Sequence, residues 1–257
     1  MMHATQTAIT DHIRILATKL VDGILPAQCI SCFQFTSQPG RLCADCWNEL
    51  SFIDHPLCDV TGIPFAFDPG EGIISARALA QPPAWHRARA AVEFNDMSRK
   101  LIHALKYYDR HEVVAMMGQS MTRAGRELLA EADFVIPVPL HPLRLWQRRF
   151  NQSAALARFI AQETGIGYQA DILKRLRSTR QQVGLSSSQR RNNVKDAFTI
   201  QEDNTGKLFG AKVVLVDDVV TTGATVGACS RILLDAGCQQ VDVLTFALVN
   251  NPLRLHI

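Results

Sequence analysis

The sequence predicts an α/β protein: a mostly parallel β-sheet with helices on both faces, preceded by a small cysteine-rich region. Two continuous apolar runs, residues 212–220 and 241–249, are typical of strands that are buried on both faces of a parallel sheet. From about residue 83 onward, strand-like and helix-like segments alternate. This alternation favours one mostly parallel sheet with flanking helices.

The composition is that of an ordinary globular protein. The chain has 257 residues, of which 47% are hydrophobic and 20% are charged. These values exclude a wholly disordered chain and allow a sizeable core. No run approaches the ~20 apolar residues that a bilayer crossing needs, and the N-terminal stretch lacks the pattern of a secretory signal. We therefore expect a cytoplasmic protein with no membrane insertion.

The N-terminal part is expected to contain one helix and an irregular lobe. Apolar residues recur every three or four positions over residues 9–25, which predicts an amphipathic helix that ends at Pro26. The segment 56–83 is rich in proline, glycine and small residues, which predicts an irregular lobe or linker. A domain boundary is therefore expected near residue 82, giving domains at 1–82 and 83–257.

The larger domain is expected to alternate strands and helices, and Gly237 is a typical C-cap for the helix before the last strand. In chain order, the expected elements are a strand at 90–94, helices at 98–108 and 112–130, a strand at 134–140, a helix at 151–164, a strand at 212–220, a helix at 223–236 and a strand at 241–249. No repeat at a fixed period is visible in the sequence.

Four of the seven cysteines have the spacing of a structural zinc site. Two Cys-x-x-Cys pairs, ten residues apart, allow two turns to present four thiolates to one tetrahedral ion. A pair of redox sites is the alternative, but neither pair begins a helix in a βαβ pattern. Four sulfur ligands leave no open coordination position for catalysis. The expected ligands of this zinc ribbon, which belongs to the region 1–82, are Cys29, Cys32, Cys43 and Cys46.

The other cysteines are less informative. Cys58 begins a sequence that looks like a further knuckle, in which Thr61 takes the place of the second cysteine. His55 lies nearby, but a single His and a single Cys in a loop are more often structural than ligands, so both are left out of the metal site. Cys229 and Cys238 are expected to be small buried residues.

The strongest functional signal is the segment 213–225. A buried strand ends in Asp217 and Asp218, and a short loop then leads into a helix. In an open α/β sheet this loop lies at the carboxyl edge, where ligands bind. Its N–H groups and the helix N-terminus favour a phosphate, while the two acids can hold vicinal hydroxyls or a divalent ion. The expected phosphate-binding residues are Thr221, Thr222, Gly223, Ala224 and Thr225.

This pattern fits a sugar phosphate and lacks both the Walker and the Rossmann glycine motifs; a chance acidic turn after a strand is the alternative. It resembles the phosphoribosyl-pyrophosphate (PRPP) signature of type I phosphoribosyltransferases, which implies that fold. The resemblance also implies a pyrophosphate loop within 136–153, with His141, Arg144, Arg148, Arg149, Asn151 and Gln152. It further implies a flexible loop within 174–193 that closes over the reaction centre, with Arg175, Arg177, Gln182, Arg190 and Asn193.

The order of motifs along nearly the whole chain resembles the ComF family (ComFC type). The motifs are the four-cysteine ribbon, Leu-Lys-Tyr at 105–107, Pro-Val-Pro-Leu-His at 137–141, Arg-x-Phe-Asn-Gln-Ser at 148–153 and the acidic Thr/Gly loop. The resemblance implies a role in DNA uptake or DNA metabolism. Two departures are visible: Arg149 stands where the family has glycine, and Thr61 replaces a cysteine. We therefore expect one zinc ion and not two.

The resemblance also implies a reaction. In an active transferase, a nucleophile displaces magnesium pyrophosphate from PRPP, and Asp217 and Asp218 hold the ribose hydroxyls directly or through Mg²⁺. Enzymes that salvage 6-oxopurines have an Asp at the fifth position of the signature, where this chain has Thr221. We hypothesise that the acceptor is not a 6-oxopurine. Lys106 is a weaker candidate, since a lysine at a helix end is more often a surface residue.

Basic residues are concentrated in one part of the chain. Residues 144–195 contain 11 Lys or Arg and two acidic residues, whereas the whole chain has a net charge of +3. A solvated basic face is one explanation. The competing function is a non-catalytic adapter that binds PRPP or single-stranded DNA, with a DNA-uptake helicase-type protein as a partner. Trp146 and Phe150 could stack on bases or pack beneath the loop.

Overall fold

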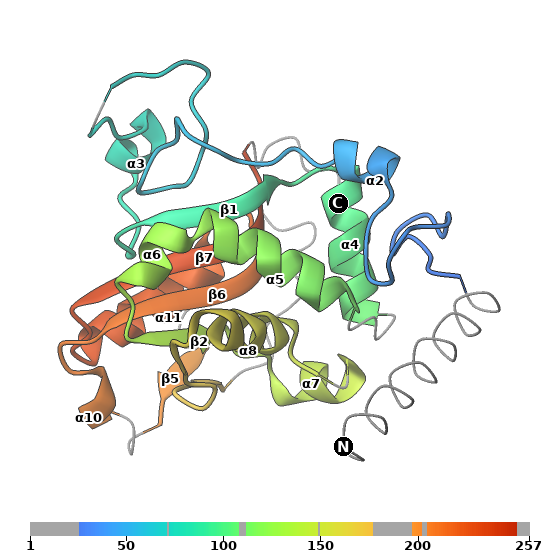
Figure 1. Ribbon diagram of the computed structural model, residues 1–257. Helices are drawn as coiled ribbons and strands as arrows, with labels where there is room; N and C mark the ends of the chain where they lie inside the picture. Colours follow the sequence, from blue (N-terminus) through green and yellow to red (C-terminus); the bar gives the residue numbers. More distant parts are fainter. Residues whose placement is uncertain are drawn as a thin grey trace, which may run out of the picture. The chain divides into compact units, whose positions relative to one another are not determined.

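The computed structural model describes residues 26–70, 72–107, 112–148, 150–176, 197–201 and 205–250 (Figure 1). The chain forms two compact units, Met1–Glu49 and Leu50–Ile257. The helix expected at 9–25 lies outside the described residues. No helix in the described ranges is both long enough and apolar enough to cross a membrane.

The second unit is built on a parallel sheet of five strands, which confirms the expected fold class. The sheet order is β1-β7-β6-β2-β3, and each neighbouring pair is parallel. The two apolar runs form the central strands, and most of their residues are buried. The strands are β1 (Ala88–Glu93), β2 (Phe134–Pro137), β3 (Gly167–Tyr168), β6 (Lys212–Val220) and β7 (Gln240–Leu248).

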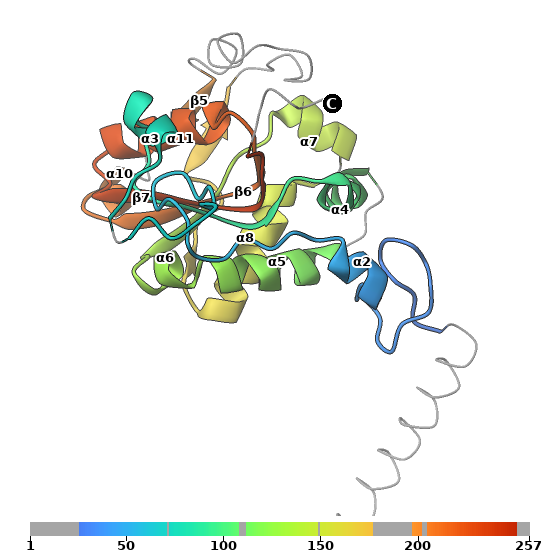
Figure 2. The same cartoon turned by 90° about the horizontal axis from the view of Figure 1, so that it is seen from above.

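Helices cover both faces of this sheet (Figure 2). Helices α5 (Glu112–Ala124) and α8 (Gln152–Thr164) pack on one face, and α11 (Ala224–Asp235) packs on the other. Helix α4 (Asp96–Tyr107) follows β1. The core between the sheet and α11 contains both late cysteines, Cys229 and Cys238, which are buried as expected.

The helix expected at 112–130 is interrupted at Gly125. Helix α5 ends at Ala124, and a short helix, α6 (Arg126–Ala130), follows. A Cβ atom at position 125 would lie 2.7 Å from the Leu244 side chain, so glycine allows a close approach to β7 there. Glycine also has a low helix propensity, and the contact with Leu244 is tertiary, so helical periodicity does not reveal it.

Several short elements were not expected. Strands β3, β4 (Leu173–Arg175) and β5 (Phe198–Ile200) have two or three residues each, and β4 pairs with β5 in an antiparallel hairpin. The basic segment after β2 contains a helix, α7 (Pro142–Arg148). The remaining short helices are α2 (Ala44–Asn48), α3 (Ala76–Ala80) and α10 (Thr205–Leu208).

Residues 50–82 pack with the sheet, although the sequence placed them before a boundary near residue 82. Backbone hydrogen bonds link Ile53 N to Ala91 O at 3.0 Å and Glu93 N to Ser51 O at 2.8 Å. The compact units therefore divide between Glu49 and Leu50. The physical reason is that this irregular segment satisfies the polar backbone groups of edge strand β1.

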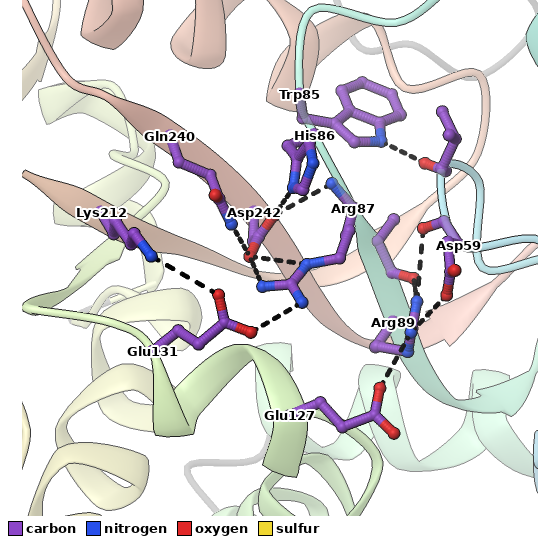
Figure 3. A network of polar contacts seen from close by, with 12 residues as sticks. Asp59, Trp85, His86, Arg87, Arg89, Glu127, Glu131, Lys212, Gln240 and Asp242 are labelled. Carbon is purple, nitrogen blue, oxygen red and sulfur yellow. Dashed lines mark hydrogen bonds and ion pairs between the residues drawn. The ribbon is translucent and has the colours of Figure 1, made fainter. Parts of the chain in front are cut away.

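Two arginines, Arg87 immediately before β1 and Arg89 within it, form ion pairs with acids from distant segments (Figure 3). The Arg87 guanidinium lies 2.8 Å from Asp242 and 3.0 Å from Glu131. The buried Arg89 guanidinium lies 2.6 Å from the Asp59 carboxylate and 3.1 Å from that of Glu127. These pairs join β1 to β7, to the region of α6 and to the segment 50–82, because each charge that the fold buries needs a partner.

Candidate functional site

The carboxyl ends of β6 and β2 place two predicted loops side by side. Pro137, the last residue of β2, pairs with Val216 of β6. The segment expected to bind pyrophosphate follows β2, and Asp217 follows Val216 of β6 directly. Both therefore lie at the same edge of the sheet, where open α/β proteins bind ligands.

The two adjacent acids have different partners. Asp217 Oδ1 accepts a hydrogen bond from Ser153 Oγ at 2.8 Å and from the Asp218 backbone N–H at 2.9 Å. The Asp218 carboxylate forms an ion pair with Lys106 of α4. The site thus brings together residues of α4, α8 and β6. Ser153 was not selected from the sequence, although it is the last residue of the Arg-x-Phe-Asn-Gln-Ser motif.

Burial changes the acidity of the first acid. Loss of hydration and, second, the negative charge of Asp218 raise the pKa of the Asp217 carboxyl to about 7. The hydrogen bond from Ser153 and the charge of Lys106 oppose this rise without cancelling it. Near neutral pH, Asp217 can therefore hold or release a proton.

This raised pKa predicts a pH-dependent stability. Between pH 4 and pH 7 the folded protein keeps a proton on Asp217 that the unfolded chain has lost, so this contribution to stability is complete below pH 4 and disappears as the pH rises through 7. Urea unfolding at pH 5 and pH 8 measures how far the free energy of unfolding decreases between these two pH values. In Asp217→Asn this decrease should be smaller than in the wild type by about 2 kcal/mol. Asp235→Asn, at an exposed position of α11, is the control. An equal fall in the Asp217→Asn variant would contradict the assignment.

The loop after the acids ends at a glycine in the left-handed conformation, where α11 begins. Gly223 has a φ of +76° and is the N-cap of α11, which begins at Ala224. Its left-handed conformation is one that glycine adopts without strain. The buried hydroxyl of Thr222 has no hydrogen-bond partner among the described residues. A buried donor of this kind is costly unless a ligand or water satisfies it.

Trp85 supports this loop from the side and was not selected from the sequence. A Cβ atom at Gly223 would lie 2.6 Å from the indole ring, and one at Gly227 would lie 3.4 Å from it. The indole Nε1–H donates to the Val60 carbonyl at 2.7 Å. Glycines one helical turn apart thus provide the space for the ring. A tryptophan in an irregular segment gives no sequence signal for such a contact.

The segment expected to bind pyrophosphate is partly structural. The Asn151 side chain accepts from Ser153 N at 3.1 Å and donates to the Val138 carbonyl at 3.1 Å, so it caps α8. Gln152 is buried in the first turn of that helix. His141 Nδ1 accepts from Leu143 N at 3.2 Å.

The arginines of the two basic segments are described only in part. Arg144 and Arg148 belong to α7, and their side chains are not among the described groups. Arg175 is buried in β4, with its guanidinium carbon 5.2 Å from the centroid of the Phe198 ring. Trp146 on α7 is 83% exposed. The expected site residues Arg149, Arg177, Gln182, Arg190 and Asn193 lie outside the described residues.

The first unit contains the four cysteines expected to bind zinc. Their sulfur atoms all lie within 4.8 Å of one another, and Cys32 Sγ is 3.6 Å from Cys43 Sγ. Tetrahedral coordination with Zn–S distances near 2.3 Å separates sulfur atoms by about 3.8 Å. The four thiols therefore fit one structural zinc ion, Cys29 and Cys46 being buried and Cys32 exposed.

Backbone dipoles favour the thiolate that a metal requires. Burial raises the pKa of the Cys29 thiol, but N–H groups of Cys32, Cys43 and Ser31 outweigh burial and lower this pKa to about 6. Two of these backbone donors are Ser31 N, at 3.4 Å from Cys29 Sγ, and Cys43 N, at 3.3 Å. Such donors orient and stabilise a ligand sulfur.

Comparison with family models agrees with this picture. A model described as "Double zinc ribbon domain" matches residues 20–78. A model described as "Phosphoribosyl transferase domain" matches residues 151–254, which include Ser153, β6 and α11. Sheet, loop and cysteine cluster together define a class: phosphoribosyltransferase-like proteins that carry an N-terminal zinc ribbon.

Individual relatives narrow this class to one family. A protein named DNA utilization protein YhgH, from Salmonella typhimurium, is 33% identical over 192 residues, which are 73% of this chain and 82% of the relative. Competence protein F of Haemophilus influenzae is 27% identical over 79% of this chain and 88% of its own length. Competence protein ComFC of Bacillus subtilis is 22% identical over 82% and 85%. The chain belongs to the ComF family, as its motifs indicated.

Proposed function

We propose that this protein binds PRPP, or a closely related 5-phosphorylated pentose, and acts in DNA uptake or DNA utilization. One observation carries the proposal: strand β6, which has two adjacent carboxylates near its carboxyl end, runs into a glycine-capped loop at the N-terminus of α11. The loop is suited to the 5-phosphate and the acids are suited to the ribose diol. Names of the relatives supply the DNA context.

Asp217 and Asp218 would carry the polar chemistry. Their carboxylates fit the ribose hydroxyls, and they also fit Mg²⁺, which is typically bound by one or two carboxylates together with substrate phosphates. When bound, Mg²⁺ would neutralise the charge of the diphosphate. In a transfer reaction the nucleophile bonds to the anomeric carbon as the bond from that carbon to the pyrophosphate oxygen breaks. Lys106 and Ser153 keep the two acids oriented for this step.

Calorimetric titration with PRPP and Mg²⁺ tests the binding. We expect Asp217→Asn/Asp218→Asn to weaken binding at least about tenfold, because two charge-assisted contacts to the sugar are lost. Asp235→Asn, at an exposed position of α11, should bind as the wild type does. Equal affinity in the double variant would contradict the proposal, provided that circular dichroism shows a folded protein.

Release of pyrophosphate from PRPP tests the catalytic part. Since Thr221 occupies the position at which 6-oxopurine enzymes have an acid, hypoxanthine and guanine should give no turnover. Turnover with either base would refute this hypothesis. The cytoplasmic location expected from the sequence remains a prediction.

A second candidate function rests on Trp146. An indole that is 83% exposed, in a segment rich in basic residues, is suited to stacking on a nucleobase. In that case the protein is an adapter for single-stranded DNA, and a DNA-uptake helicase-type protein is a candidate partner. Binding to single strands should then fall steeply with salt and weaken in Trp146→Ala. Tight binding of single strands without pyrophosphate release would favour the adapter over the enzyme.

A further inference from the structure

The zinc-ribbon segment has a specific pattern of backbone hydrogen bonds around its first cysteine. Cys29 N donates to Gln34 O at 2.7 Å, and Phe33 N donates back to Cys29 O at 3.1 Å. Phe33 has a φ of +66°. An isolated antiparallel bridge joins Gln28 to Phe35. These bonds form the tight turn that presents the first Cys-x-x-Cys pair.

The same pattern recurs in the second unit, around Cys58. Cys58 N donates to Ile63 O at 2.9 Å, and Gly62 N donates to Cys58 O at 2.7 Å. Gly62 has a φ of +70°. An isolated antiparallel bridge joins Leu57 to Pro64. Each bond connects positions with the same offset from Cys58 as its counterpart has from Cys29.

The correspondence extends to the second half of each segment. Cys43 N donates to Cys29 Sγ at 3.3 Å, and Cys43 is the N-cap of α2. In the second unit, Ser75 N donates to Cys58 Sγ at 3.3 Å, and Ser75 is the N-cap of α3. The chain thus contains two copies of one ribbon. The sequence shows a further knuckle at Cys58 but no repeat at a fixed period, because the two halves are 14 residues apart in the first copy (Cys29 to Cys43) and 17 in the second (Cys58 to Ser75).

We infer that residues 56–81 are a second zinc-ribbon repeat in which hydrogen bonds and apolar packing have replaced the metal ion. Matching the two copies aligns the four zinc ligands with one cysteine and three residues that do not provide thiolates. The aligned pairs are Cys29 with Cys58, Cys32 with Thr61, Cys43 with Ser75 and Cys46 with Ala78.

The four aligned positions of the second copy do not fit a zinc ion. A structural site needs four ligands, and alanine provides none. Instead, Thr61 Oγ1 lies 3.5 Å from Ser75 Oγ, which accepts from Ala78 N at 3.3 Å. Burial opposes ionisation of Cys58, but hydrogen bonds from Ser75 and Thr61 outweigh it and lower the pKa of that thiol. The chain therefore matches a family model named for a double ribbon, but its described residues contain one complete set of four zinc ligands.

Metal analysis of the full chain tests this inference. We expect one equivalent of zinc in the wild type and in Cys58→Ser, and loss of zinc in Cys43→Ser. The restored variant Thr61→Cys/Ser75→Cys/Ala78→Cys should bind one additional equivalent, and Co²⁺ substitution should double the thiolate-to-metal absorption band. If the triple variant does not fold, Thr61→Cys/Ser75→Cys provides three thiolates together with Cys58, and water can occupy the fourth position as in zinc sites with three protein ligands, so this variant should still gain a metal ion.

Three results would overturn the inference. Two equivalents in the wild type would show that the second copy binds metal. Loss of zinc in Cys58→Ser would show that Cys58 is a ligand. A folded triple variant without additional metal would show that the two copies do not share ligand positions.

A separate observation concerns a pocket of about 180 Å³ beside the phosphate loop. Its lining includes Thr221 and Gly223 from the loop, two arginines and no acidic residue. Arg77 comes from α3 of the metal-free repeat, and Arg231 comes from α11. Arg231 Nη1 lies 4.0 Å from the Cβ position of Gly227, so the guanidinium points back toward the N-terminus of its helix.

Both arginines are exposed, and no acidic side chain lines the pocket to balance their charge. A helix N-terminus carries a partial positive charge that repels a guanidinium. Neither Arg77 nor Arg231 has an ion pair within the ranges that the structure describes. We propose, on the basis of the function proposed above, that these two arginines supply the cationic contacts to the sugar's phosphate group. The loop itself offers only N–H groups and hydroxyls.

Titration with ribose 5-phosphate tests this assignment. Arg77→Gln and Arg231→Gln should each weaken binding about tenfold, because each removes one charge-assisted hydrogen bond. Arg99→Gln, an exposed arginine that pairs with Asp96 on α4, should have no effect. Unchanged binding in both pocket variants, with wild-type binding intact, would overturn only this assignment. Absence of wild-type binding would contradict both this assignment and the proposed function.

Discussion

Asp242→Ala is expected to lower the free energy of unfolding by about 4 kcal/mol, as for other buried ion pairs that lose one partner. The Asp242 side chain is 3% exposed. It accepts from Arg87 N at 3.0 Å, from Arg87 Nη2 at 2.8 Å and from Gln240 Nε2 at 2.8 Å (Figure 3). Alanine would leave these donors without their acceptor and the Arg87 guanidinium with Glu131 alone.

Urea unfolding at neutral pH measures this loss. Asp54→Ala is a matched control, because Asp54 is also paired with an arginine, Arg123 at 2.8 Å, but both side chains are exposed. Exposed pairs contribute less than about 1 kcal/mol. Similar losses in the two variants would mean that burial of Asp242 has no energetic effect, contrary to the expectation.

Gly223→Ala is expected to cost about 3 kcal/mol and to abolish sugar-phosphate binding. Two effects add: alanine is strained by 1–2 kcal/mol at a φ of +76°, and its Cβ atom would lie 2.6 Å from the Trp85 ring. The ring is fixed by its hydrogen bond to the Val60 carbonyl. The loop must therefore move, and its N–H groups lose the arrangement that favours phosphate.

Gly165 provides the control for this variant. It has the same φ of +76°, as the C-cap of α8, but a Cβ atom there meets no atom within 4 Å. Gly165→Ala should therefore cost only the backbone strain, about 1 kcal/mol. Trp85→Leu combined with Gly223→Ala should recover part of the larger loss. Equal costs at the two glycines would show that the indole does not confine the loop.

The central strands could be predicted because burial on both faces leaves continuous apolar runs in β6 and β7. Strands β3, β4 and β5 could not, since two or three residues are too few to show a period of two. The interruption at Gly125 depends on the Leu244 side chain. Information of that kind is tertiary and does not appear in a local pattern.

The candidate site shows the same division. Asp217, Asp218 and the Thr/Gly loop form one contiguous motif, so the sequence was sufficient to find them. The motif is also contacted from other segments, by Ser153, Lys106 and Trp85. The sequence around each of these residues does not indicate that its side chain lies at the site. The second ribbon copy was visible in the sequence only as the knuckle at Cys58, because its other cysteine positions are occupied by Thr61, Ser75 and Ala78, whereas the matching backbone turns appear only in the structure.

The hydrogen bond from Ser75 N to Cys58 Sγ has a consequence for how the protein responds to its surroundings. The second ribbon copy, residues 56–81, lines the pocket beside the phosphate loop and is stabilised without a metal ion. The cysteine cluster of the first unit, in contrast, depends on one. Zinc starvation, or oxidation of exposed thiols, would therefore disable the first unit and spare the second. In a cell short of zinc, the second unit, with the site proposed for a 5-phosphorylated pentose, would then keep its fold while the first unit loses the ion that stabilises it.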